Sequence, residues 1–511
     1  MALLSRERYS EVDIIVCDAT PEGDIAAPVG SMALSTEGVL YTKASGTGNT
    51  GWKDESEILT GNTLWVDAVN GDDATGLPGR QDRPYATPEA AVAEAVTGDL
   101  VDVRPGTYAL TGNLAKDGVN WNWQAGAIGS MITDSEMSIF DDGDDPLTMT
   151  LTGAGVFVRG EVSEPTGFAN VVHMTNPDSS FVITCGALEN TCFQESPETG
   201  GTAAIYHANG SLTVNCDTIE AQATAYYWIA GPAWINADTI RSNGNADNSG
   251  DGVLCMPPEG NSDNVFIRAH SIISAYKSAV YSSLTQSIAP NFRLWITAEV
   301  IAGGTYGVQH ASGKMYVTAQ KISASSNGGT AVGNVGPAST ELYVTSQKIA
   351  SADSLTESTD FILVFASGGK VRISCMEWDV SSISAWTGTV NLFTVTSTDP
   401  INFVCTGGKI VLPAAITTPI IGNSPSFSGG RRVFRDMHLD NSAAGGAASS
   451  PIVISDGLTV IQGVTIVTAA AASIGADSAM DITSYNSYAN TLADIVNVTV
   501  QGDLTVGAYV Q

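Results

Sequence analysis

One eight-residue pattern recurs between residues 181 and 405, and it constrains the fold more than any other feature of the sequence. It reads FVITCGAL at Phe181 and LTVNCDTI at Leu212. Seven further copies follow, which read AWINADTI, VFIRAHSI, LWITAEVI, MYVTAQKI, LYVTSQKI, VRISCMEW and the looser INFVCTGG. Successive copies begin 21 to 32 residues apart. A repeat of this length is typical of solenoid proteins, in which each repeat forms one unit stacked on the next.

The first, third and fifth positions of the pattern are apolar or small, which is the period-two alternation of a β-strand with one buried face. The third position holds a large apolar residue in every copy: Ile183, Val214, Ile235, Ile267, Ile296, Val317, Val344, Ile373 and Phe403. One such strand per repeat cannot bury its own apolar face, whereas stacked coils enclose an interior in which like side chains lie above one another. The repeat therefore predicts an all-β fold, a parallel β-helix.

The fifth position of the pattern is Cys, Ala or Ser, and this accounts for most of the cysteines. Four of the seven fall there: Cys185, Cys216, Cys375 and Cys405. We interpret these four as small side chains in the interior of the solenoid. Because the number of cysteines is odd and no CxxC or CxxxC spacing occurs, neither a disulfide framework nor a zinc site is expected.

The chain is strongly acidic, with a net charge of −31 over 511 residues. Such a surface repels nucleic acid and anionic membranes, so we expect neither as a partner. No run of 18 apolar residues occurs, which predicts no membrane insertion. The first ten residues carry Arg6, Glu7 and Arg8 where a secretory signal would have an apolar core, so the sequence predicts no such signal.

The segment before the repeats has the features of a β-helix entry. Thr87 is a helix N-cap residue, Pro88 occupies the first helical position and Gly98 follows the end, which predicts a capping helix near residues 88–97. The order WVDAVNGDD, PYATPEAAVAEA and GDLVDVRPGTY resembles the N-terminal entry of pectate-lyase-like right-handed β-helix proteins. That resemblance implies a right-handed solenoid and does not specify any chemistry.

The first 62 residues are of a different kind. From the residues we expect short strands joined by glycine turns, with Trp52 closing a small apolar cluster. The segments APVGS, LYTK and SGTGNTGW resemble a stretch near the ends of phage fibre, spike and decoration proteins. This resemblance implies that the module attaches the chain to other virion proteins. The anchoring residues it points to are Pro28, Gly30, Tyr41, Gly48 and Trp52.

Three regions follow from these observations. Residues 1–62 are the expected virion-anchoring module, and residues 63–430 are the expected right-handed parallel β-helix with its capping helix. After residue 430 the repeat loosens, although alternating strands continue. We expect residues 431–511 to form either a continuation of the β-helix or a β-rich trimerising cap.

Position two of the pattern points outward if positions one, three and five point inward. On five consecutive copies it is aromatic: Trp234, Phe266, Trp295, Tyr316 and Tyr343. A large exposed aromatic patch usually marks an interface. We predict that this column forms a subunit interface along a trimer axis or a platform on which sugar rings stack, and cover by a loop of the same chain is a third interpretation.

Position six forms a second outward column that contains acidic side chains. The simplest interpretation is a polar corner beside a turn. The catalytic interpretation rests on spacing, because carboxylates on adjacent coils lie about 5 Å apart and those two coils apart lie about 10 Å apart, close to the separations of retaining and inverting glycosidases. The weak catalytic candidates are Asp217, Asp238 and Glu299.

No cofactor is expected apart from a structural calcium ion. The acidic runs at residues 70–73 and 141–145 supply oxygen ligands of the kind that calcium prefers, although neither has the spacing of an EF-hand loop and a solvated acidic turn is the simpler interpretation. The five histidines show no HxxxH or HxH spacing, so we assign no metal site to them.

These features lead to one expected function and one alternative. We expect a structural component of a phage particle, a homotrimeric tail fibre, head fibre, tailspike or other appendage on the virion surface. It would present a rigid shaft and contact host-surface glycan for attachment. The alternative is a tailspike depolymerase, a glycosidase or lyase that cleaves host polysaccharide, so the question of enzymatic activity stays open with a structural role favoured.

Overall fold

The computed structural model describes most of the chain. The described residues are 3–9, 12–18, 21–35, 40–46, 48–54, 62–133, 137–143, 145–160, 169–192, 202–244, 250–283, 289–326, 328–353, 357–358, 361–386, 392–396, 401–413, 421–423, 430–440, 442, 452–453, 458–467, 471–474, 478–481, 492–496 and 499–501. The chain divides into two compact units, Met1–Arg104 with Lys116–Asn122, and Pro105–Ala115 with Trp123–Gln511.

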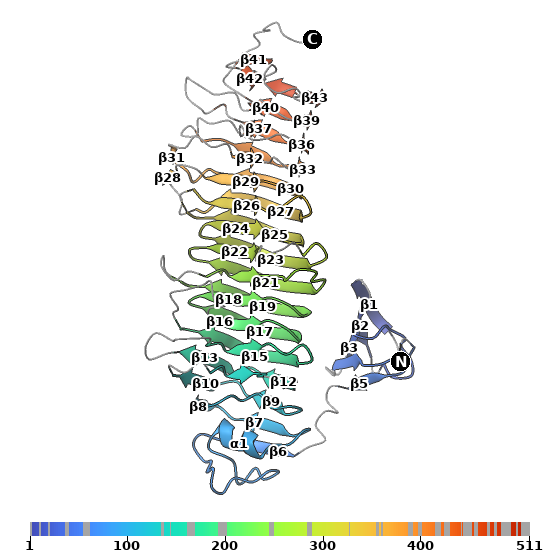
Figure 1. Ribbon diagram of the computed structural model, residues 1–511, viewed down its shortest axis with the longest axis vertical. Coiled ribbons are helices and arrows are strands. Elements are labelled where there is room, and N and C mark those ends of the chain that lie inside the picture. The colour runs from blue at the N-terminus through green and yellow to red at the C-terminus, as the bar shows by residue number, and fades with distance from the viewer. Residues whose placement is uncertain are drawn as a thin grey trace. The chain divides into compact units, whose positions relative to one another are not determined.

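The larger unit is a right-handed parallel β-solenoid of about nine turns, so the predicted all-β fold and the predicted β-helix are confirmed. Its long strands stack in sequence order, each parallel to the next, as Figure 1 shows from green to yellow. They are β15 (Ser180–Asn190), β17 (Ser211–Ala221), β19 (Ala233–Ser242), β21 (Asn264–Ser274), β23 (Arg293–Gly303), β25 (Lys314–Ala324), β27 (Glu341–Ser351) and β30 (Lys370–Asp379).

Each long strand turns a corner at position six of the pattern. In β17, burial alternates until Cys216, after which Asp217 and Thr218 both face outward and Ile219 faces inward again. The backbone pairing skips position six, because Cys216 and Thr218 pair with the neighbouring strand while Asp217 does not. The eight-residue pattern therefore begins with the first half of a long strand, in which alternate side chains face the interior. It continues through the corner and ends at the first inward-facing residue after the corner.

The two halves of the long strand are separate strands toward both ends of the stack. On one side, β12 (Thr148–Gly153) and β13 (Val156–Gly160) both pair with β15. On the other side, β33 (Ile401–Thr406) and β34 (Lys409–Val411) both pair with β30. The paired arrangement continues through β36 (Gly430–Arg435), β37 (His438–Asp440), β39 (Leu458–Gln462), β40 (Thr465–Val467), β43 (Leu492–Val496) and β44 (Thr499–Gln501).

The third-position side chains line the interior, as predicted. Ile235, Ile267 and Ile296 are at most 3% exposed, and each pairs with the next in the parallel register. The four cysteines expected at position five are buried free thiols, which agrees with their interpretation as small interior residues. Like side chains therefore stack on like side chains along the solenoid, which removes apolar area from water in every coil.

The last copy of the pattern is displaced by two residues from the expected alignment. Phe403, expected at position three, pairs with Val371 and so occupies position one. Cys405, expected at position five, pairs with Ile373 at position three. Gly407 and Gly408, with φ angles of 79° and 86°, then fall at the fifth and sixth positions of the displaced copy and interrupt the strand there. The copy therefore reads FVCTGGKI from Phe403.

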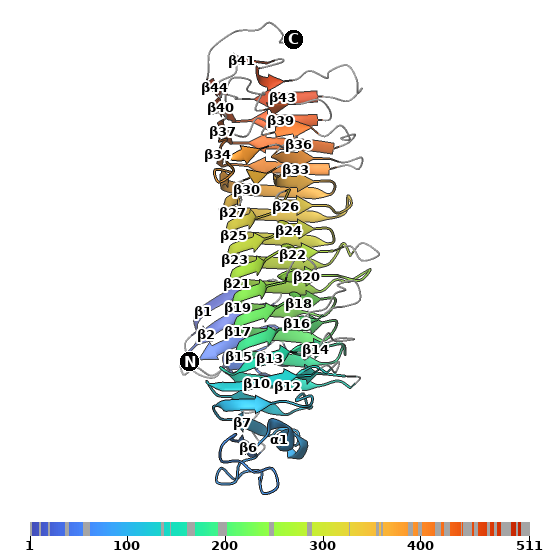
Figure 2. The same cartoon turned by 90° about the vertical axis from the view of Figure 1, so that its left-hand side faces the viewer.

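A second parallel sheet of shorter strands runs along the same solenoid and is labelled beside the long strands in Figure 2. Its strands are two to five residues long and share no recurring phrase, so they cannot be identified from the sequence alone. Eight successive strands of this sheet are β14 (Val172–Met174), β16 (Ala203–His207), β18 (Thr224–Trp228), β20 (Val253–Cys255), β22 (Ser278–Ser282), β24 (Tyr306–His310), β26 (Thr330–Asn334) and β29 (Ile362–Ala366).

The last residues of these short strands form a buried column. In register, it contains His207, Trp228, Cys255, Ser282, His310 and Asn334. Several of these side chains close the turn that follows by donating to a glycine carbonyl three residues on. The bonds from His207 Nε2 to Gly210 O and from Trp228 Nε1 to Gly231 O are 3.1 and 2.8 Å long.

The smaller unit contains a short parallel pair and the one helix of the described residues. In that unit β6 (Thr63–Val66) pairs with β7 (Leu100–Val103), and α1 (Pro88–Glu94) lies between them in sequence and contacts both. Thr87 has extended backbone, and its hydroxyl accepts a hydrogen bond from the Ala90 amide at 3.3 Å. The helix thus begins with a side-chain cap and a proline that has no amide proton to leave unsatisfied.

The N-terminal part of the smaller unit is a separate sheet. Its strands are β1 (Leu3–Tyr9), β2 (Val12–Cys17), β3 (Met32–Ser35), β4 (Leu40–Lys43) and β5 (Trp52–Asp54), paired in that order. All neighbours are antiparallel except β2 and β3, which are parallel. The parallel pair requires a crossover between its strands, and residues 18–31 supply it.

Candidate functional site

The five position-two aromatic residues form one continuous stack on the outer face of the solenoid. Neighbouring rings are nearly parallel, with interplanar angles of 5–13° and centroids 4.6–5.8 Å apart. The structure therefore brings together every residue of the predicted column: Trp234, Phe266, Trp295, Tyr316 and Tyr343. We call these five residues the aromatic ladder.

The stacking limits what the aromatic ladder offers to a partner. Each of its three inner rings has a neighbouring ring against both faces, so those faces are already covered. Trp234, the first ring, has a neighbour on one side only and is 39% exposed. Because a sugar stacks on the face of an aromatic ring, the aromatic ladder is better suited to an edge-on contact with a protein surface than to a row of sugar-stacking positions.

A charged cluster covers the other end of the aromatic ladder. Lys370 Nζ lies 5.0 Å from the centroid of the Tyr343 ring, in a cation–π contact. Glu341 accepts a hydrogen bond from the Tyr343 hydroxyl and forms ion pairs of 3.1 Å with both Lys314 and Lys370. The Tyr343 hydroxyl, followed by the two lysines, lowers the pKa of Glu341 to about 2, so this carboxylate is ionised at neutral pH.

We expect Trp295→Ala to destabilise the solenoid by about 1–3 kcal/mol, because each stacked aromatic pair is worth about 0.5–1.5 kcal/mol and Trp295 stacks on both Phe266 and Tyr316. The measurement is the free energy of unfolding in urea. Trp295→Tyr is the matched control, since a tyrosine stacks in this column at position 316. Equal destabilisation by the two substitutions would contradict a stabilising role for the stack.

The position-six column lies on the outer corner of the long strands. Asp217, Asp238 and Glu299 are all exposed, and Glu299 forms a 3.1 Å pair with His270, which is also exposed. A general acid of a glycosidase needs a raised pKa, which enzymes produce by burying the carboxyl group. An exposed corner does not provide that burial. The location agrees with the interpretation as a polar corner, and catalysis by these residues stays a prediction.

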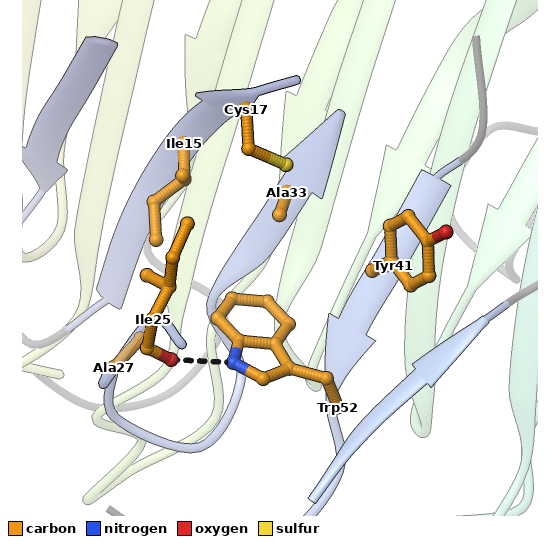
Figure 3. Packing of buried hydrophobic residues seen from close by; sticks show 7 residues of the cluster. All are labelled: Ile15, Cys17, Ile25, Ala27, Ala33, Tyr41 and Trp52. Carbon is orange, nitrogen blue, oxygen red and sulfur yellow. Dashed lines mark hydrogen bonds between the residues drawn. The ribbon is translucent and has the colours of Figure 1, made fainter. Parts of the chain in front are cut away.

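The predicted anchoring residues form the core and the turns of the N-terminal sheet. Trp52 and Tyr41 are buried in one apolar cluster, so the prediction that Trp52 closes such a cluster is confirmed. Figure 3 shows the Trp52 indole against Ile25, with its Nε1–H donating to the Ile25 carbonyl at 2.7 Å. Pro28, Gly30 and Gly48 lie in turns, and the Gly30 amide donates to the Lys43 carbonyl at 2.9 Å.

Two further residues hold this module together and were not identified from the sequence. The carboxylate of Glu22 accepts hydrogen bonds from the amides of Gly51 and Trp52, at 3.1 and 2.7 Å. The Lys43 ammonium is buried, donates to the Thr50 carbonyl and lies 5.8 Å from the Trp52 ring centroid. Gly51 has a φ of 89°, and a Cβ there would lie 2.3 Å from a backbone oxygen, so only glycine fits.

Two strands of the N-terminal sheet, β2 and β3, have apolar side chains on both faces. The inner face packs into the cluster of Figure 3, through Ile15 and Ala33 among others. On the opposite face, Ile14 pairs with Met32 and Val16 pairs with Leu34 across the parallel strands β2 and β3. Ile14, Met32 and Leu34 are 36–46% exposed. We call Ile14, Val16, Met32 and Leu34 the outer apolar face.

The two acidic turns use their carboxylates to hold the backbone. Asp73 accepts hydrogen bonds from Thr87 and from the Ala86 amide, all between 2.7 and 2.9 Å. Asp142 is buried and accepts bonds from the amides of Thr175 and Asn176, both at 2.9 Å. Asp144 lies outside the described residues. These bonds favour the interpretation as structural turns, and calcium binding stays a prediction.

Among the described residues, no helix is long and apolar enough to span a membrane. Searches with family models, among curated proteins and among solved structures found no match to this chain.

Proposed function

We propose that this protein is a structural and adhesive component of a phage particle, assembled as a homotrimer on the virion surface. In this proposal the N-terminal module attaches the chain to other virion proteins, and the β-helix is the rigid part that contacts host-surface glycan. The proposal combines the resemblance of residues 1–62 to phage fibre and spike proteins with the physical character of two surfaces.

The outer apolar face carries the proposal. A sheet of five short strands buries little apolar area, yet this one has apolar side chains on both faces. Contiguous exposed apolar side chains usually mark a surface that another protein covers. The segments that carry the resemblance to virion proteins are strand β4 and the turns before β3 and β5. A virion protein that packs on the outer apolar face would therefore explain both the composition of the face and the resemblance.

The aromatic ladder supports the trimer. Its rings cover one another and leave an edge strip that runs over five coils of the solenoid. Aromatic side chains are enriched in the cores of protein interfaces. Two further copies that pack along this strip would bury it, as expected for a subunit interface along a trimer axis.

We expect the 511-residue protein to have a mass in solution of three times 52.9 kDa, measured by light scattering. We also expect Leu34→Asp to reduce its incorporation into phage particles at least tenfold, because a charge on the outer apolar face must be desolvated when the partner packs there. Incorporation is measured by immunoblot of purified particles from cells that supply the variant.

Val29→Asp is the matched control for Leu34→Asp. Val29 is 50% exposed and Leu34 is 46% exposed, but Val29 lies in a turn and not on the outer apolar face. We expect Val29→Asp to be incorporated normally, and both variants to keep the mass of the unaltered protein. A monomeric mass would contradict the trimer, and equal incorporation of both variants would contradict the docking role of the face.

A further inference from the structure

The outer face that carries the aromatic ladder is hollowed beyond Tyr343. A depression of about 500 Å³ lies there, lined from the four successive coils that contain β27, β30, β33 and β36. Small-molecule sites in proteins have volumes of about 300–1,000 Å³. The depression is therefore of a size that holds a small ligand or one or two units of a polymer.

The depression exists because the aromatic column ends. In register, position two changes from Tyr343 to Arg372, then to Val404 and Val433. Valine is much shorter than the rings of the preceding coils, so the face is lower over these two coils. Val404 and Val433 form an apolar floor, of which the half-buried Val404 is the accessible part because Val433 is buried. Tyr343 borders this floor at the end of the aromatic ladder.

Three arginines surround this floor. Arg372, Arg431 and Arg435 line the depression, all three are exposed, and none has an ion-pair partner among the described residues. Arg431 and Arg435 flank Val433 on β36, where alternate residues share one face. In a chain with 53 acidic and 22 basic residues, three unpaired guanidinium groups around one depression oppose the overall charge.

Most of the remaining lining residues are polar and uncharged. Ser374, Thr406 and Asn402 supply hydroxyl and amide groups at the edges of the apolar floor. Hydroxyl and amide groups both donate and accept hydrogen bonds, which suits a ligand that carries several hydroxyl groups. A guanidinium group binds a carboxylate through two parallel hydrogen bonds. The lining therefore matches a ring with hydroxyl groups and a carboxylate.

We infer that this depression binds an acidic sugar unit of a polysaccharide. The carboxylate lies among Arg372, Arg431 and Arg435, and the sugar ring lies on Val404. The inference rests on the proposed contact with glycan and specifies that the glycan is a polyuronate or another carboxylated polymer. An acidic protein segment would satisfy the arginines but would not need the hydroxyl-binding groups along the floor.

The test uses the full-length protein and a hyaluronan tetrasaccharide, in which alternate sugars carry a carboxylate. Binding is measured by isothermal titration calorimetry, with chitotetraose as the neutral probe of equal length. We expect the unaltered protein to bind the hyaluronan tetrasaccharide and not chitotetraose. Arg431→Gln together with Arg435→Gln should weaken binding at least tenfold, because two charge-assisted contacts are lost.

The matched control is Arg268→Gln together with Arg293→Gln. These arginines are exposed on the same outer face, beside the aromatic ladder and away from the depression, and their replacement changes the net charge equally. We expect unchanged binding by this control. Val404→Phe is the second variant, because it fills the floor and keeps all three arginines. It should abolish binding if the depression is a shaped site.

The outcomes separate the inference from the proposed function. Equal weakening by the two arginine pairs, or full binding by Val404→Phe, would show attraction by charge alone and overturn the inference. Competition by a polyglutamate peptide or an oligonucleotide as strong as that by the tetrasaccharide would also overturn it, as would no binding of the tetrasaccharide. Trimer mass and particle incorporation depend on other residues, so these results leave the proposed function to its own test.

Discussion

Ile296→Asp should destabilise the solenoid by about 4 kcal/mol or more, or leave no soluble protein, because it removes a buried side chain and places a carboxylate without a partner in the interior. Ile296 is 1% exposed and lies between Ile267 and Val317 in the inner column. A break in one coil exposes the faces of the coils on both sides, since each coil is covered by its neighbours. The measurements are soluble yield and the free energy of unfolding in urea.

Thr297→Asp is the matched control, because it makes the same residue at the next position of the same strand. Thr297 is exposed on the outer face, so we expect a change of about 0.5 kcal/mol or less. Ile296→Val completes the series with an expected loss of about 0.5–1.5 kcal/mol, since it removes one methylene group from the interior. If Ile296→Asp and Thr297→Asp lowered the free energy of unfolding by similar amounts, positions one, three and five of the pattern would not face an enclosed interior.

The interior of the solenoid could be predicted from the sequence because a physical requirement repeats in it. Each coil needs a large apolar side chain where Ile235, Ile267 and Ile296 lie, and a small one two residues later at the corner. The requirement returns with each copy, so nine imperfect copies reinforce one another. The outward column at position two follows from the same alternation, and the aromatic ladder was found in this way.

The second sheet could not be predicted from the same repetition. Its strands are too short to alternate over several residues, and their inner column mixes polar with apolar residues. His207 and His310 belong to this column, although the five histidines have no common spacing in the sequence. A local signal was present, because both histidines are followed three residues later by a glycine with positive φ, Gly210 and Gly313. From the sequence alone, however, that spacing does not indicate a turn closed by a histidine.

The depression was hidden by the misaligned last copy of the pattern. With INFVCTGG starting at Ile401, position two would be Asn402, and no small residue follows the aromatic ladder. The two-residue displacement places Val404 there instead. The alignment could not reveal this, because Phe403 and Cys405 alternate equally well in either register. Tertiary pairing with β30 decides between the two.

The stability of the solenoid should fall as the pH is lowered from about 6.5 to about 4, because two buried histidines must take up protons. Burial lowers the pKa of both His207 and His310 from 6.5 to about 4. His207 Nε2–H donates to the Gly210 carbonyl at 3.1 Å, so Nδ1 of the neutral ring accepts from the Tyr226 hydroxyl at 3.2 Å. His310 Nε2 lies 3.1 Å from the Gly313 carbonyl. Each ring is therefore neutral in the folded protein at neutral pH.

The sign follows from these pKa values. The folded state binds fewer protons than the unfolded state between about 6.5 and 4, so the stability due to neutral burial is complete above 6.5 and is lost toward 4. At about 1.4 kcal/mol per pKa unit, each histidine contributes about 3 kcal/mol. Asp251 opposes this loss, because burial raises its pKa to about 6 and its contribution is lost as the pH rises.

Replacing both histidines by asparagine should remove this loss of stability. The same column already contains an asparagine at one position. Asn334 occupies the next place after His310 in register, and its side-chain amide donates to the Gly368 carbonyl. With the histidines absent, Asp251 governs the interval between pH 6.5 and 5, so the double variant should become more stable as the pH falls. The measurement is the urea midpoint at pH 7, 6, 5 and 4.5.

Asp251→Asn is the companion variant and should act in the opposite direction. It removes the group that gains stability at low pH, so the loss between pH 6.5 and 4 should become steeper than in the unaltered protein. Between pH 6.5 and 4, the urea midpoint should therefore fall less in the double histidine variant, and more in Asp251→Asn, than in the unaltered protein. A double histidine variant that keeps the original loss would show that His207 and His310 are not held neutral by burial, and that the inner column admits water at both coils.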